Sequence, residues 1–115
     1  MRHHSNNRKF GREKTQRHAL LRSLARNLIR DSRIRTTTAK AKELRPFVEK
    51  LVTRAKVGTM ASKRLIVSRL QSVNETNKLI ETAAKYKSRA GGYTRIVRLA
   101  DRDLDGSPMS MIEFV

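Results

Sequence analysis

The sequence predicts an α+β fold: a basic N-terminal arm, about four helices packed on a small sheet, and a C-terminal β-hairpin. Two observations support this fold class. Apolar residues recur at helical spacing from about residue 15 to residue 86. Two β-rich segments, Tyr93–Leu99 and Met109–Val115, then follow and are joined by a loop rich in Asp, Gly and Pro. Helices first and strands last in 115 residues are typical of one α+β domain.

Residues 1–14 form the first segment and show no apolar periodicity. They contain Arg, Lys, His and Asn around a single Phe10, so they cannot bury enough apolar surface to become ordered alone. We expect a basic arm that folds on its partner, with a disordered tail as the alternative. An Arg-rich, acid-poor start also resembles an organellar transit peptide, but no amphipathic pattern precedes Thr15. Residues 15–115 are predicted to form a single globular domain.

The first predicted helix starts near Thr15 and has two contrasting faces. Its apolar face comprises Leu20, Leu21, Leu24, Leu28 and Ile29. Its opposite face carries a row of arginines at four-residue spacing, Arg22, Arg26 and Arg30. Like charges at this spacing repel each other, so an anionic partner would stabilise the helix. A solvated surface is the alternative, but such surfaces usually mix charges, and no acid lies between Glu13 and Asp31.

A short β-branched segment follows and leads into the second predicted helix. Ile34–Thr38 is expected to be a brief strand or extended link, and Thr37 or Thr38 can cap the next helix. That helix spans about Ala39–Lys56. Pro46 lies inside it, which predicts either a kink or a helix that starts only near the proline.

The remaining helices and the hairpin complete the predicted order. Apolar spacing favours helices over about Met60–Val73 and about Glu75–Tyr86, although the weak break near Asn74 also allows one bent helix. Ala90–Gly92 is predicted to be a turn before the two β-rich segments.

Positive charge dominates the chain and is unevenly distributed. Lys and Arg number 27 against 10 Asp and Glu, which gives a net charge of +17. Residues 1–30 hold nine Lys or Arg and one acid, residues 86–100 hold four and no acid, and residues 101–115 are net acidic. Such self-repulsion disfavours a compact free state unless a polyanion neutralises it, so we expect a nucleic-acid partner.

The chain has no cysteine, which fits a reducing compartment, and no apolar run long enough to cross a membrane.

The acidic loop, the histidines and the glycine turn are the candidates for chemical sites. Asp101, Asp103 and Asp105 match the start of a calcium loop, but Ile112 stands where the bidentate Glu belongs, so an acidic, solvated hairpin loop is expected. The histidines, His3, His4 and His18, make a poor zinc set, and phosphate or base contacts suit them better. No nucleophile, paired acid and base or cofactor loop is apparent. We therefore expect no enzyme activity, no cofactor, no metal and no small-molecule substrate.

Gly91 and Gly92 precede Tyr93 rather than the Lys of a phosphate loop. Two glycines nevertheless let backbone amides approach a phosphate, with Arg89 and Arg95 supplying charge. Tyr93 could stack on a base, although a core position is the more common role for a single tyrosine at a strand start.

Nine short segments resemble the bacterial large-subunit ribosomal protein seventeen family and occur in that family's order. They are Met1–His3, Arg8–Arg12, Arg17–Arg22, Ile34–Thr37, Lys40–Arg45, Leu51–Lys56, Gly91–Ile96, Pro108–Met109 and Ile112–Glu113. The chain departs from the family pattern at Gln16, Ala39 and Pro46. The resemblance implies a structural constituent of the large ribosomal subunit that binds its RNA near the peptide exit side. It also implies neighbouring ribosomal proteins, with protein thirty-two as one contact, and a ribosome in the cytoplasm of a bacterium or in an organelle.

The residues and the resemblance together give a candidate RNA-binding set, because planar guanidinium groups can hold phosphates at two points. Its members are Arg2, His3, Arg8, Lys9, Arg12, Lys14, Arg17, Arg22, Arg26, Arg30, Lys40, Lys42, Arg89, Gly91, Gly92, Tyr93, Arg95 and Arg98. A free nucleoid-type DNA-binding protein is the alternative function, although no base-reading Asn or Gln accompanies the arginine row.

Overall fold

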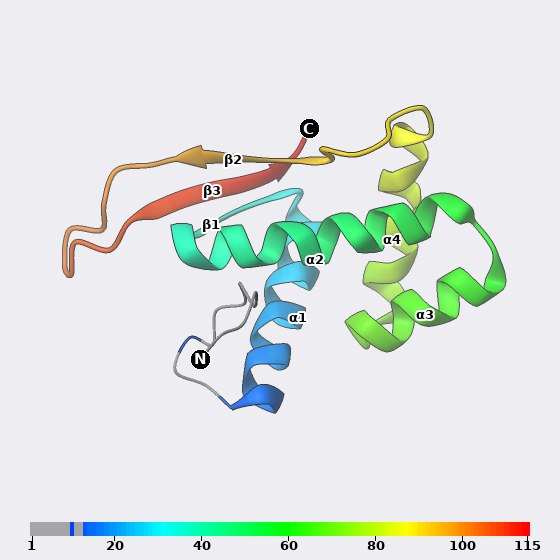
Figure 1. Ribbon diagram of the computed structural model, residues 1–115, viewed down its shortest axis with the longest axis horizontal. Coiled ribbons are helices and arrows are strands. Elements are labelled where there is room, and N and C mark those ends of the chain that lie inside the picture. The colour runs from blue at the N-terminus through cyan, green and yellow to red at the C-terminus, as the bar shows by residue number, and fades with distance from the viewer. Residues whose placement is uncertain (1–9, 11–12) are drawn as a thin grey trace, which may run out of the picture.

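A computed structural model describes residue 10 and residues 13–115, and it confirms the predicted α+β class. The arm therefore lies almost entirely outside the described residues. The elements in chain order are α1 (Lys14–Asp31), β1 (Arg33–Thr37), α2 (Thr38–Val57), α3 (Met60–Leu70), α4 (Val73–Ala83), the 3-10 turn η1 (Ala84–Tyr86), β2 (Thr94–Arg98) and β3 (Met109–Phe114). The helices and the three-stranded sheet share one core (Figure 1).

Helix α2 begins at a side-chain cap, as the sequence predicts. The Thr37 hydroxyl accepts a hydrogen bond from the Lys40 backbone N–H at 3.4 Å, which satisfies one of the free donors of the first turn. The helix then runs without interruption through Pro46, so the alternative of a start at the proline is wrong. Pro46 is exposed, while Leu44 and Val48 on either side are fully buried. Their packing holds the helix together across the backbone hydrogen bond that proline cannot make.

Helices α3 and α4 are separate, which confirms the prediction of two helices, and the alternative of one bent helix is wrong. Gln71 ends α3 in the left-handed conformation, with φ of 54°, and its N–H caps the carbonyl of Val67 at 2.6 Å. Ser72 then begins α4, and its hydroxyl accepts from the Glu75 N–H at 3.4 Å. The left-handed residue redirects the chain, and the serine cap starts the next helix at once.

The sheet has the strand order β1–β3–β2, and both pairings are antiparallel. The predicted hairpin of β2 and β3 is confirmed, and the segment after α1 is a strand that pairs with β3 from the other side. Ile112 in β3 lies opposite both Ile34 in β1 and Ile96 in β2. These three side chains form one apolar row on the face that packs against the helices, and Ile112 is fully buried there.

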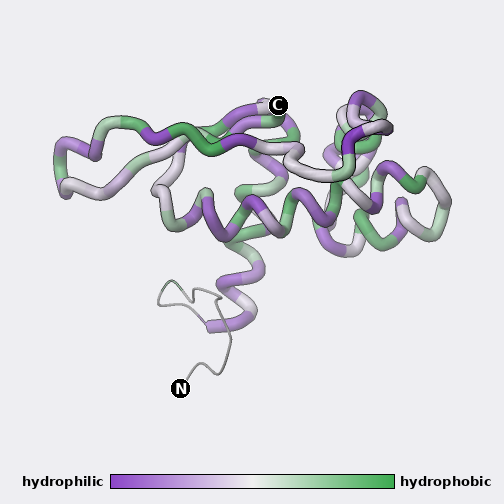
Figure 2. The backbone as a smooth tube through the Cα atoms, turned by 45° about the horizontal axis from the view of Figure 1, so that its top comes forward, coloured by the Kyte–Doolittle hydropathy of each residue, from purple (hydrophilic) through white to green (hydrophobic). Residues whose placement is uncertain are grey.

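Helix α2 links the sheet to the other helices. Its first residue, Thr38, shares a 2.7 Å hydrogen bond with the buried Ser110 of β3. Glu49 in its middle accepts hydrogen bonds from the Thr94 hydroxyl at 2.7 Å and from Arg45 at 3.2 Å. The β2–β3 hairpin extends beyond the helices at one end of the molecule (Figure 1). The N-terminal turns of α1 extend from the body in another direction and are strongly hydrophilic (Figure 2).

Candidate nucleic-acid interface

The arm residues of the candidate set are Arg2, His3, Arg8, Lys9 and Arg12, and all of them lie outside the described residues. Lys14 is the exposed first residue of α1. The structural account of the candidate interface therefore rests on the body of the protein.

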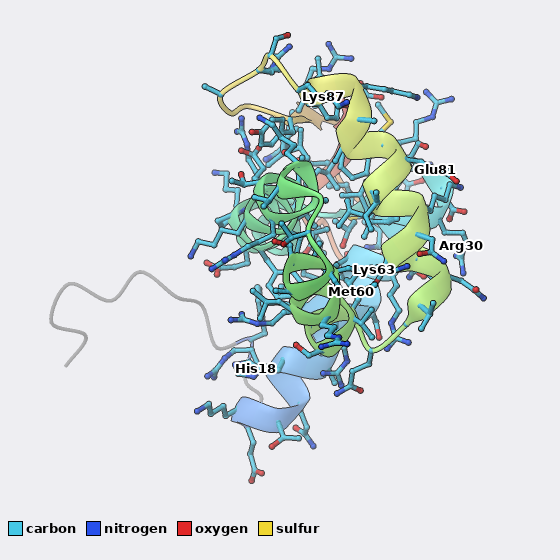
Figure 3. The ribbon with its side chains drawn as sticks, turned by 90° about the vertical axis from the view of Figure 1, so that its right-hand side faces the viewer. His18, Arg30, Met60, Lys63, Glu81 and Lys87 are labelled. Atoms are coloured by element: carbon cyan, nitrogen blue, oxygen red, sulfur yellow. The ribbon has the colours of Figure 1, made fainter. Side chains whose placement is uncertain are left out.

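The predicted arginine row of α1 is divided between two surfaces. Arg22 lines a hollow that α1 forms with α2 and α3. Arg26 and Arg30 line a different hollow, next to Glu75 at the start of α4. Figure 3 shows Arg30 beside α4, whereas His18 lies on the protruding turns of α1. Arg26 and Arg30 thus share their surroundings with an acid from α4, whereas Arg22 lies beside α2 and α3.

The arginines of α1 also differ in whether they form an ion pair with an acid. Arg30 forms an ion pair with its neighbour Asp31, with a nitrogen–oxygen distance of 3.1 Å. The hydrogen bond from Arg30 lowers the pKa of the Asp31 carboxyl below its ordinary value. Arg17 and Arg22, by contrast, make no ion pair with any residue that the structure describes. Their charges remain available for a polyanion.

The late basic patch, Arg89, Arg95 and Arg98, is held by intramolecular contacts. Arg95 reaches Glu113 across the β2–β3 pair at 2.6 Å, and Arg98 reaches Asp101 at 3.0 Å. Arg89 donates from its Nε to the carbonyl of Gly91 at 3.1 Å, within the same turn. All three side chains would have to share or exchange a partner before they bound phosphate.

The glycine turn and Tyr93 have different environments. Gly91 is exposed, and a side chain there would meet open space, whereas Gly92 has φ of 64° and so favours glycine. Tyr93 is only 1% exposed, and its ring packs against Tyr86 with centroids 5.4 Å apart. The structure thus places Tyr93 in the core, the other role that the sequence allowed, and its ring is not exposed for base stacking.

Lys40 and Lys42 lie in the first turn of α2, where Lys40 is half-buried and Lys42 is exposed. Neither forms an ion pair with a residue in the described part of the chain. Both ammonium groups thus add to the positive charge that the body can offer to a polyanion.

The acidic hairpin loop is internally neutralised in part. Besides the Arg98–Asp101 contact, Arg102 lies 3.5 Å from Asp105. The Ser107 backbone N–H donates to the Asp105 carboxylate at 3.1 Å and thereby lowers its pKa.

Across residues 10 and 13–115, no cluster of three or more His, Asp or Glu side chains is arranged to hold a metal ion. No helix among these residues combines the length and apolar character needed to cross a membrane.

A basic groove lies between α1, α2 and α3, and the sequence interpretation missed most of it. Three adjoining hollows share Phe47 and Arg69 in their walls. Cationic side chains dominate its walls, which also contain one phenyl ring and one acid: Arg17, Arg22, Glu43, Phe47, Lys50, Arg54 and Arg69. Lys50 and Arg54 are spaced four residues apart on α2, which was a usable sequence signal. The contribution of Arg69 from α3 depends on how the helices pack.

Comparisons with known proteins show which proteins the chain resembles. A family model described as ribosomal protein L17 matches residues 20–115. The large ribosomal subunit protein bL17 of Sphingopyxis alaskensis is 50% identical, with 100% of this chain and 84% of the relative covered. The proteins of the same name from Wolinella succinogenes and a Campylobacter jejuni strain are each 47% identical. Those two matches cover 100% of this chain and 100% and 99% of the relatives.

Proposed function

The chain belongs to the ribosomal protein L17 family, and we propose that it is a structural, non-catalytic constituent of the large ribosomal subunit that binds large-subunit ribosomal RNA. One observation carries the RNA-binding part of the proposal. The cations around the N-terminal half of α1 have no acidic partner among the described residues, in a chain of net charge +17. Binding to a phosphate backbone would neutralise these charges and release counterions.

The arm and the body have distinct roles in this proposal. Arg2, Arg8, Lys9 and Arg12 of the arm and Lys14 at the start of α1 insert between RNA segments, while Arg17 and Arg22 contact the backbone from a rigid helix. The protein lies near the peptide exit side, beside other large-subunit proteins that include protein thirty-two. It acts in the ribosomes of the bacterial cytoplasm, with an organellar ribosome as the alternative location.

Sedimentation of gentle cell lysates tests the assignment to the large subunit. The chain should migrate with the large subunit after the subunits are separated, and crosslinks should map to large-subunit RNA and to neighbouring proteins. Migration free of ribosomes, or with chromosomal DNA at an affinity for duplex DNA equal to that for ribosomal RNA, would overturn the proposal in favour of a nucleoid-type protein.

Salt dependence tests the role of the arm. Deleting residues 1–12 removes Arg2, Arg8, Lys9 and Arg12 and leaves α1 intact. Each phosphate contact contributes a slope of roughly −0.7 to −0.9 to the plot of log affinity against log salt, so the deletion should flatten this slope by roughly three units. An unchanged slope would show that the arm makes no contact with RNA phosphates.

A further inference from the structure

The basic groove between α1, α2 and α3 is concave, and its largest hollow is close to the lower size limit of ligand clefts. Its two larger hollows measure about 310 and 240 Å³, and ligand clefts begin at roughly 300 Å³. Phe47 and Arg69 line both hollows and also the third. The groove therefore offers one aromatic side chain and several cations in a continuous concave surface, with Glu43 as the one acid in its walls.

The cations of the groove have no acidic partner within the described chain. This holds for Arg17, Arg22, Lys50, Arg54 and Arg69, which come from three different helices. Repulsion among them is a standing cost to the fold, and an anion in the groove would relieve it.

One buried donor in the wall of the groove has no protein acceptor in the described chain. The Nε atom of Arg22 is buried and has no hydrogen-bond partner in the described structure. Buried polar groups nearly always have a partner, because the loss of water is otherwise uncompensated. Arg22 lines the same hollow as Phe47 and Arg69, so an acceptor bound there would lie beside both a second guanidinium and an aromatic ring.

A phosphate next to a planar base matches this combination. We propose that the basic groove binds one unstacked nucleotide of RNA, with its phosphate between Arg22 and Arg69 and its base against Phe47. Single-stranded and bulged RNA exposes base faces that aromatic and guanidinium groups can stack on, whereas a duplex keeps its bases stacked inside. The inference deepens the proposed function, since it names the class of RNA structure that this part of the protein recognises.

Two fluorescent RNA probes test the proposal on the full chain. One is a perfect RNA duplex, and the other is the same duplex with a central three-nucleotide bulge. The parent protein should bind the bulged probe about tenfold or more tightly than the duplex, because one stacked base contributes roughly 1–3 kcal/mol, which corresponds to about fivefold to more than a hundredfold. Phe47→Leu keeps the apolar contact and removes the ring, so it should reduce this preference by roughly fivefold or more.

A charge-matched pair of variants separates the groove from general electrostatics. The groove variant Lys50→Gln/Arg69→Gln and the control variant Arg64→Gln/Lys87→Gln each remove one Lys and one Arg at exposed positions. Neither control residue lines the groove, and Lys87 lies at the opposite end of the molecule from His18 (Figure 3). The groove variant should weaken binding of the bulged probe at least tenfold more than the control does. On the duplex the two variants should have equal effects.

Three outcomes would overturn the inference. The first is equal affinity of the parent protein for the two probes. The second is an equal effect of the groove and control variants on the bulged probe, with their folding confirmed by thermal melting. The third is a groove variant that binds RNA normally but loses affinity for polyglutamate, which would assign the groove to an acidic protein segment. Each outcome leaves the proposed function standing if the chain still sediments with the large subunit, so the two failures are distinguishable.

Discussion

The Nζ atom of Lys56 lies 2.9 Å from the hydroxyl oxygen of Tyr93 and 5.0 Å from the centroid of its ring. Lys56 also donates to the carbonyl of Arg89, which accepts from the Tyr93 hydroxyl at 3.1 Å as well. These contacts join the last turn of α2 to the glycine turn that precedes β2. A charged hydrogen bond at the edge of the core is thus one of the contacts that position the hairpin relative to the helices.

Replacement of Lys56 by Met should raise the pKa of the Tyr93 phenol. The hydrogen bond from Lys56 lowers the pKa of Tyr93, and burial, which raises it, would remain after the substitution. Burial raises the pKa of Tyr86, so ultraviolet titration of the parent protein should show two tyrosine transitions on opposite sides of the ordinary value. The Tyr86→Phe variant lacks one of these transitions and so assigns each transition to its tyrosine. A Tyr93 transition at the same pH in the Lys56→Met variant would contradict the assigned role of the lysine.

The cap of α4 should make stability depend on pH in the acid range. The Ser72 hydroxyl donates to the Glu75 carboxylate, and this hydrogen bond is the main cause that lowers the pKa of Glu75. A carboxyl with a depressed pKa in the folded state stabilises the fold above its unfolded pKa, and this contribution is lost as the pH falls through the folded value.

Ser72→Ala should therefore destabilise the protein by about 1 kcal/mol near neutral pH and by less at about pH 3. Urea unfolding at the two pH values measures the difference, with Ser68→Ala, at an exposed hydroxyl on α3, as the control. An equal loss at both pH values would show that Glu75 takes no part in the cap.

The isoleucine row at the centre of the sheet should carry much of the stability between sheet and helices. Ile112→Ala removes a fully buried side chain and should cost about 2–5 kcal/mol in free energy of unfolding. Val97→Ala, on the opposite face of the sheet and 36% exposed, should cost less than about 1 kcal/mol. Denaturant unfolding compares them. Similar losses for the two variants would mean that the helices do not pack on the Ile112 face.

The late basic patch should contribute less to RNA binding than its charge suggests. Arg95→Gln/Arg98→Gln removes two cations that already contact Glu113 and Asp101. Arg17→Gln/Arg22→Gln removes two that contact no acid in the described chain. We expect the first variant to flatten the salt dependence of ribosomal RNA binding by less than about one unit and the second by roughly 1.5 units. Equal flattening would show that RNA displaces the intramolecular acids freely.

Conversion of the loop acids Asp101, Asp103 and Asp105 to Asn should leave RNA binding equal or slightly tighter. These carboxylates repel a polyanion, and the substitution would release Arg98 from its ion pair. Equilibrium binding at fixed salt measures the effect, and a thermal melt with added calcium serves as a second readout. Weaker RNA binding in the variant, or a calcium-dependent rise in melting temperature of the parent protein, would contradict this prediction.

Much of the fold could be predicted because its determinants are local. Apolar spacing indicates the helices, and the sequence offers Thr37 or Thr38 as the cap of α2, of which the structure shows Thr37. The break between α3 and α4 was less clear, because Gln71 adopts a left-handed conformation that sequence usually marks with Gly or Asn. The pairing of β1 with β3 joins segments more than 70 residues apart, and no local pattern specifies such a contact.

The candidate site was less predictable because it depends on pairing across elements. The number of cations along the chain does not show whether the α1 row or the late basic patch is the stronger candidate for RNA binding. Whether an arginine is free depends on the sheet register that sets Arg95 opposite Glu113, and on the packing of α4, which brings Glu75 beside Arg26 and Arg30. The basic groove likewise requires three helices to be packed before Phe47 and Arg69 meet.

The central strand of the sheet is the last element to be made. During synthesis all four helices, β1 and β2 leave the ribosome before residues 109–114, and β1 and β2 have no hydrogen-bonding neighbour in the sheet until β3 enters between them. The sheet thus cannot form until β3 has been synthesised. A nascent chain halted before β3 would expose two unsatisfied strand edges, which are templates for aggregation. Synthesis of β3 and closure of the sheet are therefore coupled, and quality control that recognises exposed strand edges would detect copies of the chain that lack β3.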